Sequence, residues 1–165
     1  MTVTAVGGSV AAQDDGTAAA FTAWVRPHLL AMAALATRLT SYDDRDDVVQ
    51  EALVRAWRRW STYDESRGSP LPWLLAITAD RARRRRPRPT AIAEKTVVHD
   101  FTPDVDLERA IAKLSDRQRL AVNLYYFVGL DVAETASVMG CSTGTVKSTL
   151  SDARGRMRDL LKDEA

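Results

Sequence analysis

Short polar side chains between residues 142 and 151 are of the types that read DNA bases, and basic side chains follow them. In a helix-turn-helix the second helix enters the major groove N-terminus first, so hydrogen-bonding groups come early and cations later. We expect base or phosphate contacts from Ser142, Thr143, Thr145, Lys147, Ser148, Ser151 and Arg154. The alternative is a polar, solvated face on a structural helix.

A second candidate surface is basic. Six arginines lie within eight residues, namely Arg81, Arg83, Arg84, Arg85, Arg86 and Arg88. Like charges at this density repel one another and destabilise a helix end unless a polyanion or an acidic partner lies beside them. We therefore expect the run to contact nucleic acid, whose counterions a basic surface releases.

A third candidate surface is acidic. The formal net charge of +1 conceals strong segregation, because Asp43, Asp44, Asp46, Asp47 and Glu51 crowd one segment. Opposite patches on one small protein suit two different partners. An acidic face beside an apolar stripe suits basic residues on a partner helix. The simpler interpretation is an ordinary capped helix in which Glu51 pairs with Arg55.

The side chains that catalysis or metal binding needs are missing from the sequence. Cys141 is the only cysteine, and with the two histidines His28 and His99 it forms no zinc-ligand set of the usual spacing. There is no glycine-rich phosphate loop and no nucleophile with an identifiable base, so we expect neither enzyme activity nor a cofactor. With no signal peptide and no apolar run of roughly 18 residues, we predict a cytoplasmic protein without membrane insertion.

Three helices are expected to position the acidic and arginine-rich surfaces. After a frayed tail over residues 1–16, apolar residues recur at helical steps over 17–39, where Pro27 should kink or restart the helix. A second helix carries an apolar stripe over 48–60, and Ser69 with Pro70 begins a third. Its expected inner face is Leu71, Leu74, Leu75, Thr78 and Ala82, with Trp73 and Ile77 on a neighbouring face. Trp57, Trp60 and Trp73 are expected in the core.

The C-terminal part has the spacing of a helix-turn-helix. Prolines bracket residues 87–103, which we interpret as a flexible linker. Beyond a helix over 104–114, capping boxes at 115–118 and 131–134 open two further helices, and Ser142 caps the last one. The first of the capped helices should bury Leu120, Leu124 and Phe127 and end at Gly129. The sequence thus predicts an all-α fold with two small helical domains, 17–86 and 104–165.

Three segments, in order, resemble the sigma-70 family, specifically its compact extracytoplasmic-function group. They are Asp46 to Trp57, Pro72 to Arg84, and Leu114 to Arg119 with Gly144 to Ser148. The resemblance implies a transcription initiation factor that has a region 2-like and a region 4-like domain and binds core RNA polymerase and promoter DNA. An anti-sigma factor is a common partner in this group.

The resemblance also assigns roles to residues. It implies that Asp47, Gln50 and Glu51 contact the clamp helices of the polymerase largest subunit, and that the polymerase flap is a further contact. For reading and opening the minus-10 element it implies Tyr63, Arg81, Arg83, Arg84 and Arg85. The helix-turn-helix residues would read the minus-35 element as duplex.

Two positions depart from the family pattern. Asp80 stands where many members carry asparagine, which places a negative charge near the presumed path of the DNA strand. Thr135 replaces a large aliphatic residue, which implies either a looser local core or a hydroxyl bonded to the preceding turn.

The main alternative is a free-standing helix-turn-helix regulator whose N-terminal half dimerises or binds a ligand. The acidic helix and the arginine-ended helix favour the sigma interpretation, because a ligand domain needs neither. A pure protein-binding adaptor would leave the helix-turn-helix face unexplained.

Overall fold

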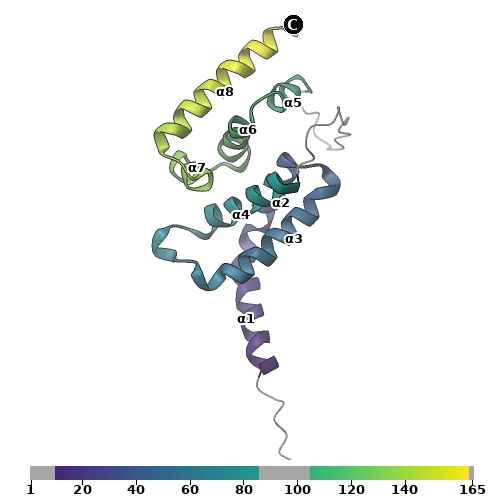
Figure 1. Cartoon of the computed structure of the whole chain (residues 1–165), viewed down its shortest axis with the longest axis vertical. Coiled ribbons are helices and arrows are strands. Elements are labelled where there is room, and N and C mark those ends of the chain that lie inside the picture. Colours follow the sequence, from purple (N-terminus) through teal and green to yellow (C-terminus); the bar gives the residue numbers. More distant parts are fainter. Residues whose placement is uncertain (1–9, 86–104, 164–165) are drawn as a thin grey trace, which may run out of the picture.

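The computed structural model describes residues 10–85 and 105–163, which form two helical bodies (Figure 1). The N-terminal body comprises α1 (Val10–Val25), η1 (Arg26–His28), α2 (Leu29–Leu39), α3 (Tyr42–Arg59), η2 (Trp60–Thr62), η3 (Glu65–Arg67) and α4 (Pro70–Arg85). The C-terminal body comprises α5 (Val105–Ala112), α6 (Asp116–Val122), η4 (Asn123–Val128), α7 (Val132–Met139) and α8 (Thr143–Asp163). No strand occurs within these two ranges, and the all-α prediction is confirmed. The predicted linker, 87–103, lies outside the described residues.

The first helix differs from its prediction at its start. It begins at Val10, so residues 10–16 are helical where the sequence predicted a frayed tail. Alanine has the highest intrinsic helix propensity, and Ala11 and Ala12 extend the helix ahead of the predicted start. The break at Pro27 is confirmed, because a short 3-10 turn separates α1 from α2 there.

Contrary to the sequence prediction, residues 17–39 are long and apolar enough for a membrane span by composition alone. Such a window is weak evidence, because core helices pass the same test. Here Phe21, Val25, Met32 and Leu35 lie in a hydrophobic core shared with α3 and α4. These four side chains thus have a packing role inside the protein, although only 22% of the apolar window is buried and Leu30 is exposed.

The core of the N-terminal body is built where α2, α3 and α4 meet. Leu74 and Leu75 are fully buried against Ala52 and Ala56, whose small side chains allow α3 and α4 to approach closely. Trp57, Trp60 and Trp73 pack on this core as predicted, although each keeps some exposure. Ile77 is also buried, at 6% exposed, so the inner face of α4 is wider than predicted.

Local capping signals give the C-terminal body its boundaries. Both predicted capping boxes are present, with Ser115 and Gln118 opening α6 and Asp131 and Glu134 opening α7. The helix before α7 ends at Gly129 (φ 84°) and α7 ends at Gly140 (φ 62°), left-handed conformations that favour glycine.

One helix changes its period, and this overturns one predicted core residue. Residues 123–128 are π-helical, which adds residues to the turn and rotates the side chains that follow. As a result Phe127 is 43% exposed, whereas Leu124 is fully buried. The prediction that Phe127 faces the core was wrong, because it assumed an unbroken α-helical period.

Thr135 on α7 decides between the two alternatives for that position. Its side chain is fully buried, and its Oγ1 has no hydrogen-bond partner among the described residues. The predicted bond from this hydroxyl to the preceding turn is therefore wrong. An unsatisfied buried hydroxyl lowers local stability, which fits the looser core.

The two bodies pack directly against each other. Leu124, Leu130 and Val138 of the C-terminal body belong to the same hydrophobic cluster as Leu74 and Leu75 of α4. In Figure 1, α7 lies next to α4. This contact encloses apolar surface that neither body could bury alone.

Arg38 of α2 provides the polar part of this contact. Its Nε donates to Oδ1 of the fully buried Asn123, and its Nη2 lies 3.2 Å from Oε1 of Glu108. The guanidinium carbon also lies 3.4 Å from the centre of the Phe127 ring, a cation–π arrangement. One side chain thus holds three residues of the other body.

We expect Arg38→Ala to loosen the contact between the bodies. Leaving the buried Oδ1 of Asn123 without its donor costs about 1–3 kcal/mol, so hydrogen exchange of the backbone amides over residues 123–130 should accelerate by about tenfold. The matched control is Arg26→Ala, which removes an exposed arginine from the same body. Equal exchange rates in both variants would show that Arg38 does not hold the bodies together.

Candidate nucleic-acid and polymerase interfaces

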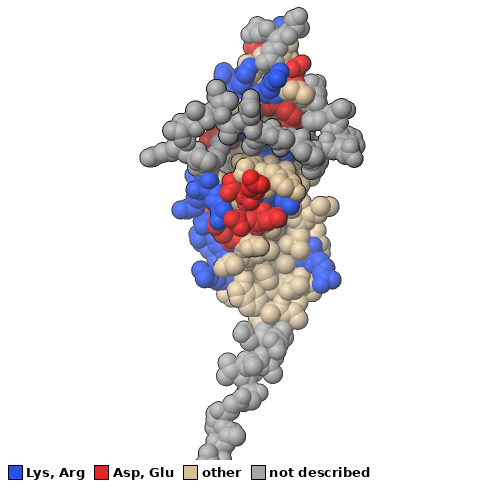
Figure 2. Space-filling model, turned by 90° about the vertical axis from the view of Figure 1, so that its right-hand side faces the viewer, with Lys and Arg blue, Asp and Glu red and all other residues tan. Residues whose placement is uncertain are grey.

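The acidic surface is positioned by the start of α3. Ser41 caps the helix by accepting a hydrogen bond from the backbone N–H of Asp44 at 3.3 Å. From there, Asp47, Gln50 and Glu51 follow at spacings of three and four residues and so share one face. Figure 2 shows acidic side chains gathered in one patch of the N-terminal body, with basic side chains beside it.

The predicted acidic and basic residues meet in one surface depression between α3 and α4. Asp47, Gln50 and Glu51 line it together with Arg81 and Arg85. Three more arginines line it as well: Arg55, which the sequence suggested only as a partner of Glu51, and Arg58 and Arg59, which the sequence pattern did not single out. Their spacing of three and four residues places them on one side of the predicted helix, and this spacing could have identified them from the sequence.

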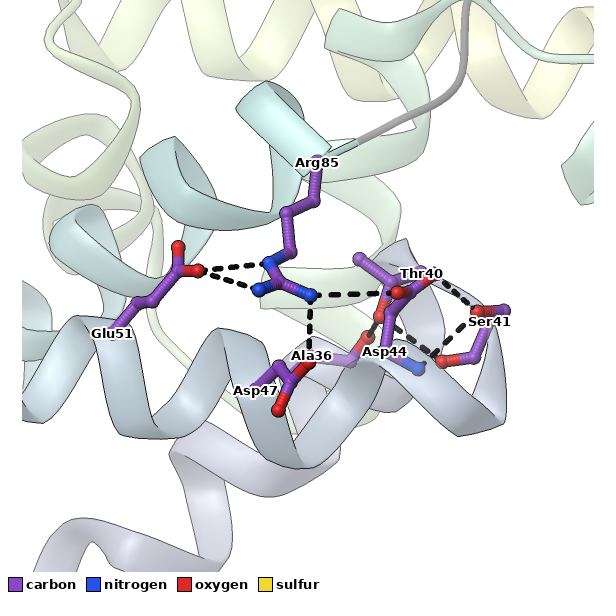
Figure 3. A network of polar contacts seen from close by, with 7 residues as sticks. All are labelled: Ala36, Thr40, Ser41, Asp44, Asp47, Glu51 and Arg85. Atoms are coloured by element: carbon purple, nitrogen blue, oxygen red, sulfur yellow. Dashed lines mark hydrogen bonds and ion pairs between the residues drawn. The ribbon is translucent and has the colours of Figure 1, made fainter.

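Arg85 joins the two predicted surfaces directly (Figure 3). Its Nε and Nη2 donate to Oε1 of Glu51 at 2.9 and 2.7 Å, and its Nη1 donates to Oδ2 of Asp47 at 2.8 Å. Asp44 Oδ1 lies 3.6 Å from the same Nη1. The hydrogen bond to Glu51, followed by that to Asp47, raises the pKa of the Arg85 guanidinium. Glu51 therefore pairs with Arg85, and the simpler pairing with Arg55 is not formed.

Asp80 holds the other three predicted arginines. Its carboxylate accepts from Arg81, from Arg83 at 3.0 Å and from Arg84 at 3.1 Å. Partial burial would raise the pKa of Asp80, but these hydrogen bonds outweigh it and hold the pKa well below its usual value. The negative charge that the sequence places near the presumed DNA path thus organises arginine side chains.

The crowding of arginines at the end of α4 is therefore relieved within the molecule. Arg81, Arg83 and Arg84 share one carboxylate of their own helix, and Arg85 uses the carboxylates of α3. Arg86 and Arg88 lie outside the described residues. The side chains of Arg83, Arg84 and Arg85 are 74%, 61% and 32% exposed. Arg81 is the most buried of the four, with 17% of its side chain exposed.

Tyr63 is held in place by its own loop and by the aromatic core. Its hydroxyl donates to the carbonyl of Gly68 at 2.7 Å. Its ring centre lies 5.1 Å from that of Trp24 and 5.3 Å from that of Trp73. The side chain is half-buried, and part of its ring surface is already covered.

The helix-turn-helix presents most of its predicted residues to solvent. The side chains of Ser142, Thr143, Lys147, Ser148, Ser151 and Arg154 are exposed, whereas Thr145 is half-buried. Ser142 Oγ caps α8 by accepting from the backbone N–H of Thr145 at 3.1 Å. Arg154 Nη1 donates to the hydroxyl of Tyr126 in η4 at 3.4 Å.

The C-terminal body also covers one side of α4. Asp80 and Arg83 line a second depression together with Leu120, Val138 and Arg117 from the C-terminal body. Arg83 thus stands at the boundary between the bodies, unlike Arg85, which stands over α3.

Comparisons with known proteins assign the family. The sigma-70 region 2 family matches residues 24–88, and the sigma-70 region 4 family matches residues 104–157. The chain is 36% identical over 165 residues to the ECF RNA polymerase sigma factor SigM of Mycobacterium tuberculosis, an alignment that covers 92% of this chain and 82% of SigM. The chain belongs to the extracytoplasmic-function sigma factors.

Other relatives and solved structures agree with this assignment. The sigma factor is 31% identical over 133 residues to SigK of Mycobacterium ulcerans, covering 70% of this chain and 71% of SigK. CnrH, solved in complex with the cytosolic domain of CnrY, has a TM-score of 0.71, 26% identity, and coverage of 92% of this chain and 93% of CnrH. RpoE of Bartonella quintana, solved with the anti-sigma factor NepR, has a TM-score of 0.67, 26% identity, and coverage of 86% and 96%.

We expect Asp80→Asn to strengthen binding of the sigma factor to single-stranded DNA. Releasing three arginines should raise the affinity for a single-stranded oligonucleotide about three- to tenfold and steepen its salt dependence by about 0.7 per added phosphate contact. Fluorescence anisotropy over a salt series measures both quantities. Because the Asp80 carboxyl stays ionised at neutral pH, substitution tests its role better than titration.

The control for this change is Asp46→Asn, which removes the same charge from a carboxylate that pairs with Arg45 alone. Equal gains in the two variants would mean that only total charge matters. Weaker binding by Asp80→Asn would show that Asp80 places the arginines productively for DNA.

Proposed function

We propose that the N-terminal body docks on core RNA polymerase and holds the opened minus-10 strand, while α8 reads the minus-35 element as duplex. The observation that carries this proposal is the depression between α3 and α4, where an acidic face meets the arginines of α4. A protein that only binds duplex DNA needs no such face. The family assignment therefore favours this function over a free-standing helix-turn-helix regulator.

In this proposal, basic side chains on the clamp helices of the largest polymerase subunit bind to Asp47, Gln50 and Glu51. Their exposure and common face support the assignment. Charge complementarity at such a surface governs the rate and specificity of association more than its final affinity. The polymerase flap is the proposed contact of the C-terminal body.

The proposed minus-10 surface consists of Arg81, Arg83, Arg84, Arg85 and Tyr63. An opened strand needs cations along its phosphates and a place for unstacked bases. Phosphate oxygens compete with the Asp80 and Glu51 carboxylates for these guanidinium groups. Tyr63 can offer a base only the part of its ring that Trp24 and Trp73 leave open.

The two promoter elements cannot be read while the bodies stay packed as described. Their names place them about 25 base pairs apart, or about 85 Å of duplex. The bodies share a hydrophobic cluster and thus lie in direct contact. We infer that they separate on polymerase, which also uncovers the side of α4 that the C-terminal body covers.

A regulatory partner follows from the structural relatives. RpoE of Bartonella quintana was solved with an anti-sigma factor, and CnrH with the cytosolic domain of CnrY. We propose that an anti-sigma factor binds this protein too. Its place of action is then the cytoplasm, where RNA polymerase works.

In vitro transcription with purified core polymerase tests the proposal. Promoters selected with the reconstituted holoenzyme should give discrete transcripts that depend on the protein. The double variant Asp47→Asn with Glu51→Gln should bind core polymerase about tenfold more weakly, since coupling between charged interface groups is of this order or larger. Its transcription should recover at high protein concentration.

The control is Asp152→Asn with Asp159→Asn, which removes equal charge from exposed positions of α8. This control should bind core polymerase normally. Absence of any promoter-specific transcript with the unmodified protein would refute the proposed function.

The minus-35 assignment has its own test in α8. Replacing Lys147 or Arg154 by alanine should weaken holoenzyme binding to a minus-35 duplex and reduce the salt slope by about 1 for each lost phosphate contact. Arg156→Ala serves as the control, because Arg156 lies half a turn around α8 from Lys147. An unchanged slope in both test variants would exclude DNA contact by this face.

A further inference from the structure

The observation that calls for explanation is the position of Arg85. It is the last residue of α4, yet its guanidinium lies over α3 among Asp44, Asp47 and Glu51 (Figure 3). Two of these carboxylates belong to the surface that we propose for polymerase, and Arg85 belongs to the surface that we propose for DNA. One ion-pair cluster therefore contains groups that are needed by two different partners.

We propose that Arg85 couples the two binding events: in the free protein it occupies the carboxylates that receive core polymerase, and polymerase binding releases it to the promoter strand. This inference rests on the proposed function and adds an order of events to it. Arg85 acts as an internal substitute for a basic side chain of the polymerase.

The charges of the cluster permit this exchange. One guanidinium faces three carboxylates, so two negative charges remain uncompensated among these four groups. This negative excess lies at the start of α3, away from Arg55, Arg58 and Arg59 near the end of that helix, and there it still attracts a basic group while Arg85 is bound. Both nitrogen donors that face Glu51 share its Oε1, so Oε2 accepts from neither and stays available to an incoming cation, which then competes with Arg85 for the carboxylate.

Because the cluster is exposed, its ion pairs can change partners at a small cost in free energy. The Arg85 side chain is 32% exposed, and those of Asp44, Asp47 and Glu51 are 39%, 56% and 43% exposed. Ion pairs at such exposed positions stabilise a fold only weakly, so they open without unfolding it. A deeply buried pair could not change partners in this way.

The other three arginines cannot serve this purpose. Arg81, Arg83 and Arg84 are held by Asp80, which lies on their own helix. A partner that neutralises Asp47 and Glu51 does not remove the carboxylate of Asp80. Within the described part of the chain, Arg85 is thus the member of the predicted minus-10 set that links both surfaces.

A purely structural role is the competing explanation, since a cation at the end of a helix also stabilises the helix dipole. The two explanations predict opposite changes in polymerase affinity when Arg85 is removed. A structural Arg85 that is removed loosens α4 against α3 and weakens every function of the body. A coupling Arg85 that is removed strengthens polymerase binding and weakens DNA binding.

The experiment compares Arg85→Gln with Arg84→Gln in the full chain. Core polymerase affinity is measured with fluorescently labelled protein in about 0.1 M salt, where surface charges are only partly screened. Holoenzyme affinity is measured for a single-stranded oligonucleotide from the minus-10 segment of a selected promoter. Arg85→Gln should bind polymerase about two- to fivefold more tightly and the oligonucleotide about three- to tenfold more weakly. Arg84→Gln should lose oligonucleotide affinity alone.

A second variant covers the case in which Arg85→Gln fails to fold. Arg85→Lys keeps the charge, but its single ammonium group cannot bridge Glu51 and Asp47 as the planar guanidinium does. It should also bind polymerase more tightly, while keeping most of the oligonucleotide affinity. Weaker or unchanged polymerase binding by the folded variants would overturn the coupling. Failure of the unmodified protein to bind core polymerase would instead refute the proposed function.

Discussion

The close approach of α3 and α4 is the constraint on which the rest of the N-terminal body depends. Ala52 and Ala56 are fully buried where the two helices meet, and their small side chains let Leu74 and Leu75 of α4 pack tightly. At this separation the end of α4 lies over the acidic start of α3, so Arg85 reaches Glu51. Apolar packing, which is not directional, thus fixes the geometry of a directional charge cluster.

This arrangement explains how a strongly basic helix end remains folded without its nucleic acid. Four arginines stand at the end of α4, and each has a carboxylate within ion-pair distance. Their mutual repulsion is offset locally, and the pairs of Arg83, Arg84 and Arg85 involve arginines exposed enough for the pairs to be weak. Binding partners therefore exchange ion pairs that already exist. Such exchange changes net stability little and leaves specificity to the geometry of the incoming groups.

What the sequence could predict rests on short local motifs, whereas it missed an irregular helical turn and the contacts between distant segments. The predictions of capping boxes at Ser115 and Asp131 and of the start of α4 at Pro70 were all correct, because each feature depends on only a few neighbouring residues. The π-helical turn that exposes Phe127 and the pairing of Arg85 with α3 were not foreseen. The three surfaces were each identified by composition, but a single sequence carries no signal that two of them share one depression.

The contact between the two bodies follows the same physical logic as the charge cluster. Its apolar part, which joins Leu124 and Val138 to α4, favours association in water. Its polar part centres on Arg38, which is 20% exposed and hydrogen-bonded to the buried Asn123. This directional bond favours one specific alignment of the two bodies. Interfaces of such mixed character within a chain resemble transient protein–protein contacts. A larger partner that binds both bodies more strongly can therefore separate them without unfolding either one, because each retains a hydrophobic core of its own.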